Sequence, residues 1–180
     1  MALADEISRR DFVVTAPQLI VLAVSAAVAI ACVLFHYEAM NWSSLVALRL
    51  PLPRRLRIVV LLVVMMMAHV VEVWFFGLTF WWLDRWPELG HLPGTFHEGA
   101  LDFVYYSVTC FTTLGFGDIV PTGAVRILTG CEALVGLSLI TWSASFGFLE
   151  MQRDWGEFRR PGSLRDRSES APADEPPAPD

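Results

Sequence analysis

The chain contains no lysine and only three cysteines in its 180 residues. Cys32, Cys110 and Cys131 all lie in apolar stretches, and an odd number at such positions argues against a disulfide framework and a cysteine-based metal site. All 13 basic residues are arginines, and no basic patch interleaved with aromatic residues occurs, which argues against nucleic-acid binding. Because no nucleophile–base or metal constellation occurs either, we expect neither an enzyme nor a resident cofactor.

Long apolar runs, in contrast, are abundant. Hydrophobic residues make up 54% of the chain and the mean hydropathy is +0.49, which is high for a soluble protein. At about 1.5 Å per residue, three runs can cross a hydrocarbon core of about 30 Å as helices, over residues 17–36, 58–83 and 123–150. The second run ends in a cluster of Trp and Phe that is typical of a membrane surface. We therefore predict an all-α membrane protein with three transmembrane helices.

The segments between these runs are shorter or richer in charge. A further apolar stretch, 100–112, has too few residues to cross a bilayer as a helix. The remaining predictions are an N-terminal segment, an arginine-rich loop containing two prolines, an outer loop and a disordered, proline-rich tail, over residues 1–16, 37–57, 84–99 and 151–180 respectively.

The arginines also predict an orientation in the membrane. Four lie in the loop before the second run and five follow the third, whereas only Arg85 and Arg126 lie from the start of the second run to the end of the third. Because loops rich in arginine stay in the cytoplasm, we expect the 37–57 loop and the C-terminus to be cytoplasmic and the N-terminus to lie outside. The expected location is the plasma or inner membrane, with several passes through it.

The strip Thr112–Asp118, "TTLGFGD", follows the short apolar stretch and must return to the face from which that stretch enters. Non-helical backbone at membrane depth is tolerated only where protein buries it or where it lines a water-filled cavity. Gly115 and Gly117 permit left-handed backbone angles. Alternation of left- and right-handed residues directs successive carbonyls to one side, and four such strips around an axis can replace the hydration shell of an ion.

At these residues the sequence resembles the pore domain of potassium channels. The resemblance extends from Tyr105-Tyr106-Ser107 through the strip to Pro121 and on to Gly136. It is closest in kind to bacterial channels with two helices and a pore loop, and is similar to the pore of two-pore-domain channels. It covers residues 58–150, so that the first span is an additional helix, which we expect to stabilise the outer helix from its periphery.

The resemblance implies a re-entrant pore helix and a filter loop between an outer and an inner helix, with four chains around one pore. The implied outer helix, outer loop, pore helix, filter and inner helix are 58–83, 84–99, 100–112, 113–118 and 123–150. The implied function is passive, potassium-selective conduction by a homotetramer surrounded by lipid, in which K⁺ is the transported ion. The alternatives are a non-selective cation channel, a subunit of a potassium-uptake transporter, or a non-conducting membrane scaffold.

By the same resemblance, the filter coordinates K⁺ through backbone carbonyls and the Thr113 hydroxyl. The carbonyls belong to Thr113, Leu114, Gly115 and Phe116, and Gly117 completes the filter. Two positions depart from the commonest pattern: Phe116 replaces a tyrosine, and Leu114 replaces a valine or isoleucine.

Four residues are expected to support the filter: Thr112, Asp118, Tyr105 and Tyr106. Because Phe116 has no hydroxyl, we expect Tyr105 or Tyr106 to bind the Asp118 carboxylate from behind the filter. The alternative is that both tyrosines pack against the outer helix. Thr112, likewise, is either a support of the filter or a plain helix-packing residue.

Several further residues within the spans are candidates for gating or for structure. Gly136 is either a hinge of the inner helix or a site of close helix packing, and Gly130 shares the second interpretation. His69 and Glu72 lie on one helix face, and ionisable residues at this depth are functional candidates.

For Glu72, the alternatives are a bond to the end of the pore helix, a structural clasp with His69 or a neighbouring subunit, and a role in pH sensing. His69 and Glu72 alone are too few ligands for a metal site. Glu132 is expected to brace the pore helix from behind, and Ser143 to lie near a cytoplasmic gate.

Overall fold

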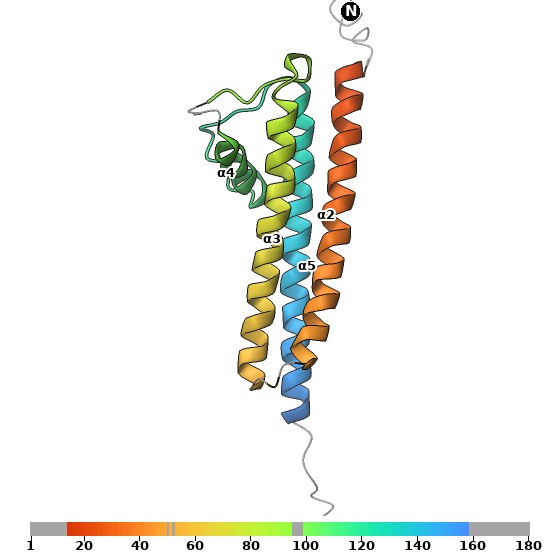
Figure 1. The fold of residues 1–180 in the computed structure, drawn as a ribbon, viewed down its shortest axis with the longest axis vertical. Helices are drawn as coiled ribbons and strands as arrows, with labels where there is room; N and C mark the ends of the chain where they lie inside the picture. Colours follow the sequence, from red (N-terminus) through yellow and green to blue (C-terminus); the bar gives the residue numbers. More distant parts are fainter. Residues whose placement is uncertain (1–13, 50, 52, 95–98, 159–180) are drawn as a thin grey trace, which may run out of the picture.

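A computed structural model describes residues 14–49, 51, 53–94 and 99–158 (Figure 1). Three long helices lie side by side, and a short helix lies next to one end of the bundle. The long helices are apolar enough to span a membrane, and no strand occurs within these ranges. The helices in chain order are α2 (Ala16–Arg49), α3 (Arg54–Leu83), α4 (Ala100–Phe111) and α5 (Arg126–Phe158), with 3₁₀ turns η1 (Pro87–Leu89) and η2 (Gly123–Val125).

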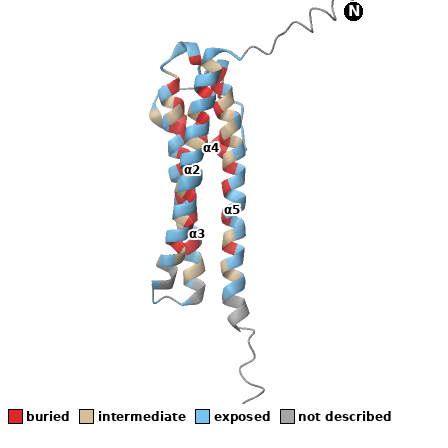
Figure 2. Ribbon diagram, turned by 90° about the vertical axis from the view of Figure 1, so that its right-hand side faces the viewer, coloured by how far each residue is buried: buried red, intermediate tan, exposed pale blue. Residues whose placement is uncertain are grey.

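The short helix α4 packs against α3 and α5, whereas α2 covers these two helices from the other side (Figure 1). α2 begins at the end of the bundle where α3 leads into the 84–94 loop. The buried residues line the facing sides of the helices, and much of the outward surface is exposed (Figure 2). Such exposed apolar surface is compatible with lipid or with further copies of the chain.

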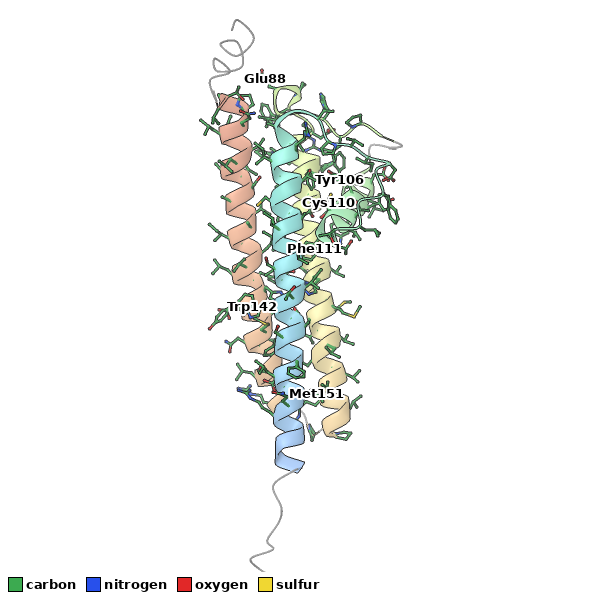
Figure 3. The ribbon with its side chains drawn as sticks, turned by 180° about the vertical axis from the view of Figure 1, so that it is seen from behind. Glu88, Tyr106, Cys110, Phe111, Trp142 and Met151 are labelled. Carbon is green, nitrogen blue, oxygen red and sulfur yellow. The ribbon has the colours of Figure 1, made fainter. Side chains whose placement is uncertain are left out.

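The core is densest where α4 meets the long helices. Phe76 and Phe80 of α3 are fully buried, as is Leu128 of α5. From α4, Tyr106 and Phe111 enter the same cluster, and the ring of Tyr106 meets that of Phe80 edge-on at 5.0 Å between centroids. Figure 3 shows Tyr106, Cys110 and Phe111 at this junction, with Trp142 and Met151 farther along α5.

Two glycines allow the backbone of α4 to approach its neighbours. A Cβ at Gly77 would lie 2.9 Å from the Cα of Val104, and one at Gly136 would lie only 2.2 Å from the carbonyl oxygen of Phe111. The second distance is too short for any side chain. α5 remains one continuous helix through Gly136, so the structure gives this glycine a packing role at the end of α4, and its role as a hinge stays a prediction.

The first span is longer than predicted. It was expected to end at residue 36 and to be followed by a loop over 37–57, but α2 continues to Arg49 and α3 begins at Arg54. No proline or glycine interrupts residues 37–49, and Met40 packs against Leu61 and Met65 of α3. The two prolines at 51 and 53 confine the loop to a few residues, because neither can continue a helix.

The inner helix also differs from its predicted bounds of 123–150. Residues 123–125 form a 3₁₀ turn, and α5 extends to Phe158, into the predicted disordered tail. The charged residues there are compatible with a helix, and Arg153 pairs with Glu150 one turn earlier at 2.8 Å. The rest of the tail and residues 1–13 of the predicted N-terminal segment lie outside the described residues.

Gly136→Ala tests the close contact between α5 and α4. The added methyl group would overlap the Phe111 carbonyl, and overpacking of this kind costs about 1–3 kcal/mol. Gly130→Ala is the matched control, since a Cβ there meets no atom within 4 Å. We expect a lower thermal unfolding midpoint for Gly136→Ala only. Equal midpoints, with channel opening altered in Gly136→Ala alone, would favour the hinge instead.

Candidate functional site

The loop after α4 is fixed by hydrogen bonds to the end of that helix. Thr112 caps the helix, and its amide donates to Val108 O at 3.1 Å. The next three amides turn back in the same way: Thr113 N donates to Cys110 O at 2.9 Å, and Leu114 N and Gly115 N both donate to Thr109 O, at 2.9 and 3.1 Å. These bonds satisfy carbonyls that an α-helix leaves free at its C-terminus.

The same bonds determine where the loop carbonyls point. In a planar trans peptide, the C=O of one residue points away from the N–H of the next. Because the amides of Thr113, Leu114 and Gly115 face α4, the carbonyls of Thr112, Thr113 and Leu114 point away from it. The loop thus presents successive carbonyl oxygens on the side opposite its helix.

Backbone angles alternate along the loop. Thr113, Gly115 and Gly117 have φ values of 59°, 52° and 80°, so every second residue is left-handed. Among the described residues, Thr113 is the only non-glycine with positive φ. For a β-branched residue this conformation is a genuine outlier, of the kind that costs about 1–3 kcal/mol and clusters at functional sites. The alternation is the one that directs successive carbonyls to one side.

Nothing in the single chain covers this loop. Residues 112–118 are all exposed, including Leu114 at 58% and Phe116 at 63%. A Cβ placed on Gly115 or Gly117 would meet no atom within 4 Å. These two glycines are therefore explained by their backbone angles, since there is ample space for a side chain.

A family model described as "Ion channel" matches residues 58–152, which is more than half of the chain. The chain belongs to this ion channel family. The family is of the potassium-channel pore type, and the match runs from α3 through the loop to α5, leaving α2 outside it. No curated protein and no solved structure matches the chain.

In this channel, Tyr105 and Asp118 brace the loop from the side. The Tyr105 hydroxyl donates to Asp118 Oδ2 at 2.9 Å, as the first of the two sequence alternatives expects. The Tyr105 ring lies nearly parallel to that of Phe116, at 6.4 Å and 7°. The hydrogen bond to Asp118 raises the pKa of the Tyr105 phenol, because it stabilises the protonated form.

Tyr106 and Thr112 have other partners. The Tyr106 hydroxyl lies 2.9 Å from Thr129 Oγ1 of α5, so this tyrosine joins α4 to the inner helix and does not contact Asp118. The hydroxyl of Thr112 donates to Val108 O of its own helix at 2.7 Å. Of the two predicted interpretations of Thr112, this bond favours a packing and capping residue.

The outer loop, predicted only as a connection, is hydrogen-bonded to the segment that follows residues 112–118. Val120 N donates to Pro93 O at 3.2 Å, Thr122 N donates to His91 O at 2.8 Å, and Gly94 forms an isolated bridge with Ile119. A Cβ on Gly94 would lie 2.5 Å from Asp118 O. The sequence did not predict these contacts, because nothing in residues 84–94 resembles a strand.

Glu132 braces the pore helix, as the sequence predicts. It is fully buried, and its Oε1 is hydrogen-bonded to the Ser107 hydroxyl of α4. The same hydroxyl lies 2.8 Å from Val73 O of α3. Ser107 therefore joins all three helices around the loop, while Glu132 Oε2 has no hydrogen-bond partner among the described residues.

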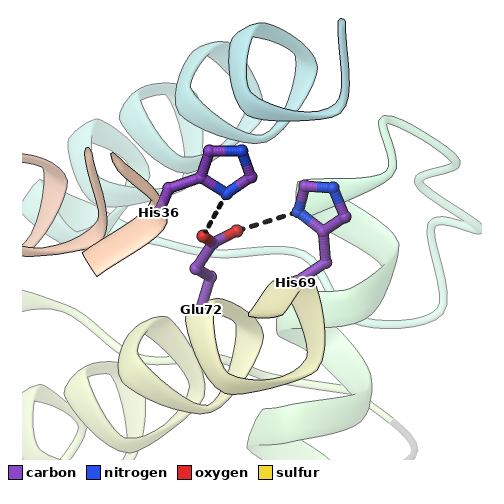
Figure 4. A group of neighbouring side chains, drawn as sticks. All are labelled: His36, His69 and Glu72. Carbon is purple, nitrogen blue, oxygen red and sulfur yellow. Dashed lines mark hydrogen bonds and ion pairs between the residues drawn. The ribbon is translucent and has the colours of Figure 1, made fainter. Parts of the chain in front are cut away.

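Glu72 is level with the end of α4, where the His69 ring meets that of Phe111 at 5.8 Å. Its hydrogen bonds, however, go to His69 and to His36, and not to the pore helix (Figure 4). The predicted bond between Glu72 and His69 is therefore present, whereas a role in structure or in pH sensing stays a prediction. Ser143, expected near a gate, contacts both imidazoles. Sequence reasoning missed His36 because the first span was ended at that residue.

Tyr105→Phe removes only the brace to Asp118. We expect the channel to form but to lose conduction severalfold faster during sustained opening, because the outer end of the loop is less well held. Single-channel recordings measure the open duration. Tyr106→Phe, which breaks the bond to Thr129 instead, is the matched control. If both variants kept the wild-type open duration, the brace would have no role in the filter.

Ser107→Ala leaves the Glu132 carboxyl buried without a partner. We expect the free energy of unfolding to fall by about 1–3 kcal/mol, the usual cost of a buried polar group without its hydrogen bond. The control is Ser138→Ala, since the exposed Ser138 hydroxyl binds only Leu134 O of its own helix. Thermal unfolding of the purified channel checks this, and an unchanged midpoint for Ser107→Ala would contradict the bracing role.

Proposed function

We propose that this channel is potassium-selective and that Thr113–Gly117 forms its selectivity filter. The observation that carries the proposal is the alternation of left-handed residues at Thr113, Gly115 and Gly117. It supports a ladder of carbonyl oxygens, and rings of such oxygens are what replaces the hydration shell of K⁺ in a filter. Under this proposal the carbonyls of Thr113, Leu114, Gly115 and Phe116 coordinate the ion.

The channel acts as a homotetramer under the same proposal. Each chain carries one filter loop, and one ladder of carbonyls cannot surround an ion. The loop is also exposed in the single chain, whereas non-helical backbone at membrane depth must be covered by protein or line a water-filled path. Four copies around an axis satisfy both requirements. A transporter subunit with several different loops is the weaker alternative, because this chain carries one loop.

The pore helix contributes to the same site. α4 ends at Phe111, next to the loop, and the C-terminal end of a helix carries a partial negative charge. This charge favours a cation that has shed part of its water. Asp118, next to the last filter glycine, adds a carboxylate at the outer end.

The distribution of arginine supports one orientation of the channel in the membrane. The arginine-rich end of the bundle, with the α2–α3 connection and the end of α5, lies opposite the filter. By the positive-inside rule this end is cytoplasmic. We therefore propose that the filter and the start of α2 face the outside of the plasma or inner membrane.

A flux assay with two glycine variants tests the function. Proteoliposomes holding the purified channel should take up K⁺ much faster than Na⁺. Gly115→Ala should abolish this flux, because a left-handed angle costs an L-residue about 1–2 kcal/mol and four copies would be strained. Gly99→Ala is the matched control, since Gly99 has φ −82° and room for a Cβ.

Two other outcomes of this assay would contradict the proposal. Equal K⁺ and Na⁺ flux, lost in Gly115→Ala, would make the protein a non-selective cation channel. Selective flux that survives in Gly115→Ala would place the filter elsewhere in the chain.

A further inference from the structure

Four polar side chains, three of them buried, meet at the junction of the three long helices, and Figure 4 shows His36, His69 and Glu72. Glu72 of α3 lies between two histidines: its Oε1 is 2.7 Å from His36 Nδ1 of α2, and its Oε2 is 2.9 Å from His69 Nδ1. Ser143 Oγ of α5 lies 3.0 Å from His36 Nε2 and 3.2 Å from His69 Nε2. His36 and Glu72 are fully buried, and the His69 side chain is 19% exposed.

A ring of four hydrogen bonds needs more hydrogens than these side chains ordinarily carry. Each bond needs one hydrogen, and the Ser143 hydroxyl supplies one. The other three must come from His36, His69 and Glu72. Two neutral imidazoles and a carboxylate carry only two, so they cannot form all four hydrogen bonds at once. A cation held between the two Nδ1 atoms and the carboxylate needs no hydrogen at those two contacts.

We propose that His36, His69 and Glu72 bind a divalent transition metal ion of the Zn²⁺ class. Two imidazoles and a carboxylate are a ligand set that suits Zn²⁺, which leaves one position of a tetrahedron open. One ligand atom from each residue lies within 4.8 Å of the others. The N–O contacts of 2.7 and 2.9 Å would open to about 3.3 Å, the edge of a tetrahedron with bonds of about 2.0–2.1 Å.

Ser143 is placed to support such a site from behind. A metal on the two Nδ1 atoms leaves a hydrogen on each Nε2, and both Nε2 atoms already lie within hydrogen-bond distance of Ser143 Oγ. This oxygen has two lone pairs and can accept both. Ligating histidines usually donate their second ring nitrogen in this way, which fixes the tautomer and the ring orientation.

A route to the site exists on one side. The exposed part of His69 lines a cavity of about 300 Å³, which also touches Thr112 at the start of the filter loop and Ile140 of α5. The metal would fasten α2, which lies outside the family match, to the outer helix of the pore. It would thereby give the additional helix a defined attachment near the end of α4, where the His69 ring meets that of Phe111.

Metal content of the purified full-length protein tests the proposal, after any polyhistidine tag has been removed. The protein is incubated with Zn²⁺, passed through a desalting column and assayed for zinc by mass spectrometry. We expect about one Zn²⁺ per chain. Less than one Zn²⁺ per ten chains would overturn the proposal and leave a purely hydrogen-bonded cluster.

Variants locate the bound ion. His36→Ala should lose the zinc, and Ser143→Ala, which keeps all three ligands, should weaken the affinity about 10–100-fold. The matched control is His91→Ala, because exposed His91 also lies near a carboxylate, Asp84, at 3.5 Å. Zinc that is retained in His36→Ala but lost in His91→Ala would be surface binding and would contradict the proposal. The wild-type stoichiometry decides the matter even if His36→Ala fails to fold.

Discussion

The backbone from Thr112 to Asp118 cannot lie in hydrocarbon with its polar groups unpaired, and the rest of the structure follows from how it avoids this. Its first amides bond to the end of α4, which satisfies the helix carbonyls and directs the loop carbonyls away. Since each unpaired group costs several kcal/mol in lipid, the outward carbonyls require either water, an ion or a neighbouring chain. This requirement supports the proposed pore assembled from several copies.

Holding α4 at the required depth is the task of the neighbouring helices. Gly77 and Gly136 let it approach α3 and α5 to backbone distance, and Ser107 joins it to both through Val73 and Glu132. These contacts come from one side of the helix only. The other side carries the loop and stays open, which is consistent with a pore built on the exposed face.

The sequence predicted α4 to within one residue and the left-handed filter glycines, because a motif with fixed spacing and the length of an apolar run are local signals. It missed what depends on pairing across the chain. His36 was predicted only as the end of a span. Its partner Glu72 is 36 residues away, so no local pattern links the two residues. For Gly136 the sequence left both a hinge and close packing open, because only the structure places the Phe111 carbonyl beside it. The hydrogen bonds between the outer loop and residues 119–122 could not be predicted, because the outer loop has no periodic pattern.

The location of bound ions relative to the loop carbonyls tests the proposed filter most directly. Crystals of the assembled channel grown with Tl⁺, a heavy monovalent ion that can replace K⁺, would reveal bound ions by anomalous scattering. We expect a row of peaks on a fourfold axis, between rings formed by the carbonyls of Thr113, Leu114, Gly115 and Phe116. Assemblies without peaks on the axis, or with these carbonyls turned away from it, would contradict a filter built from these residues.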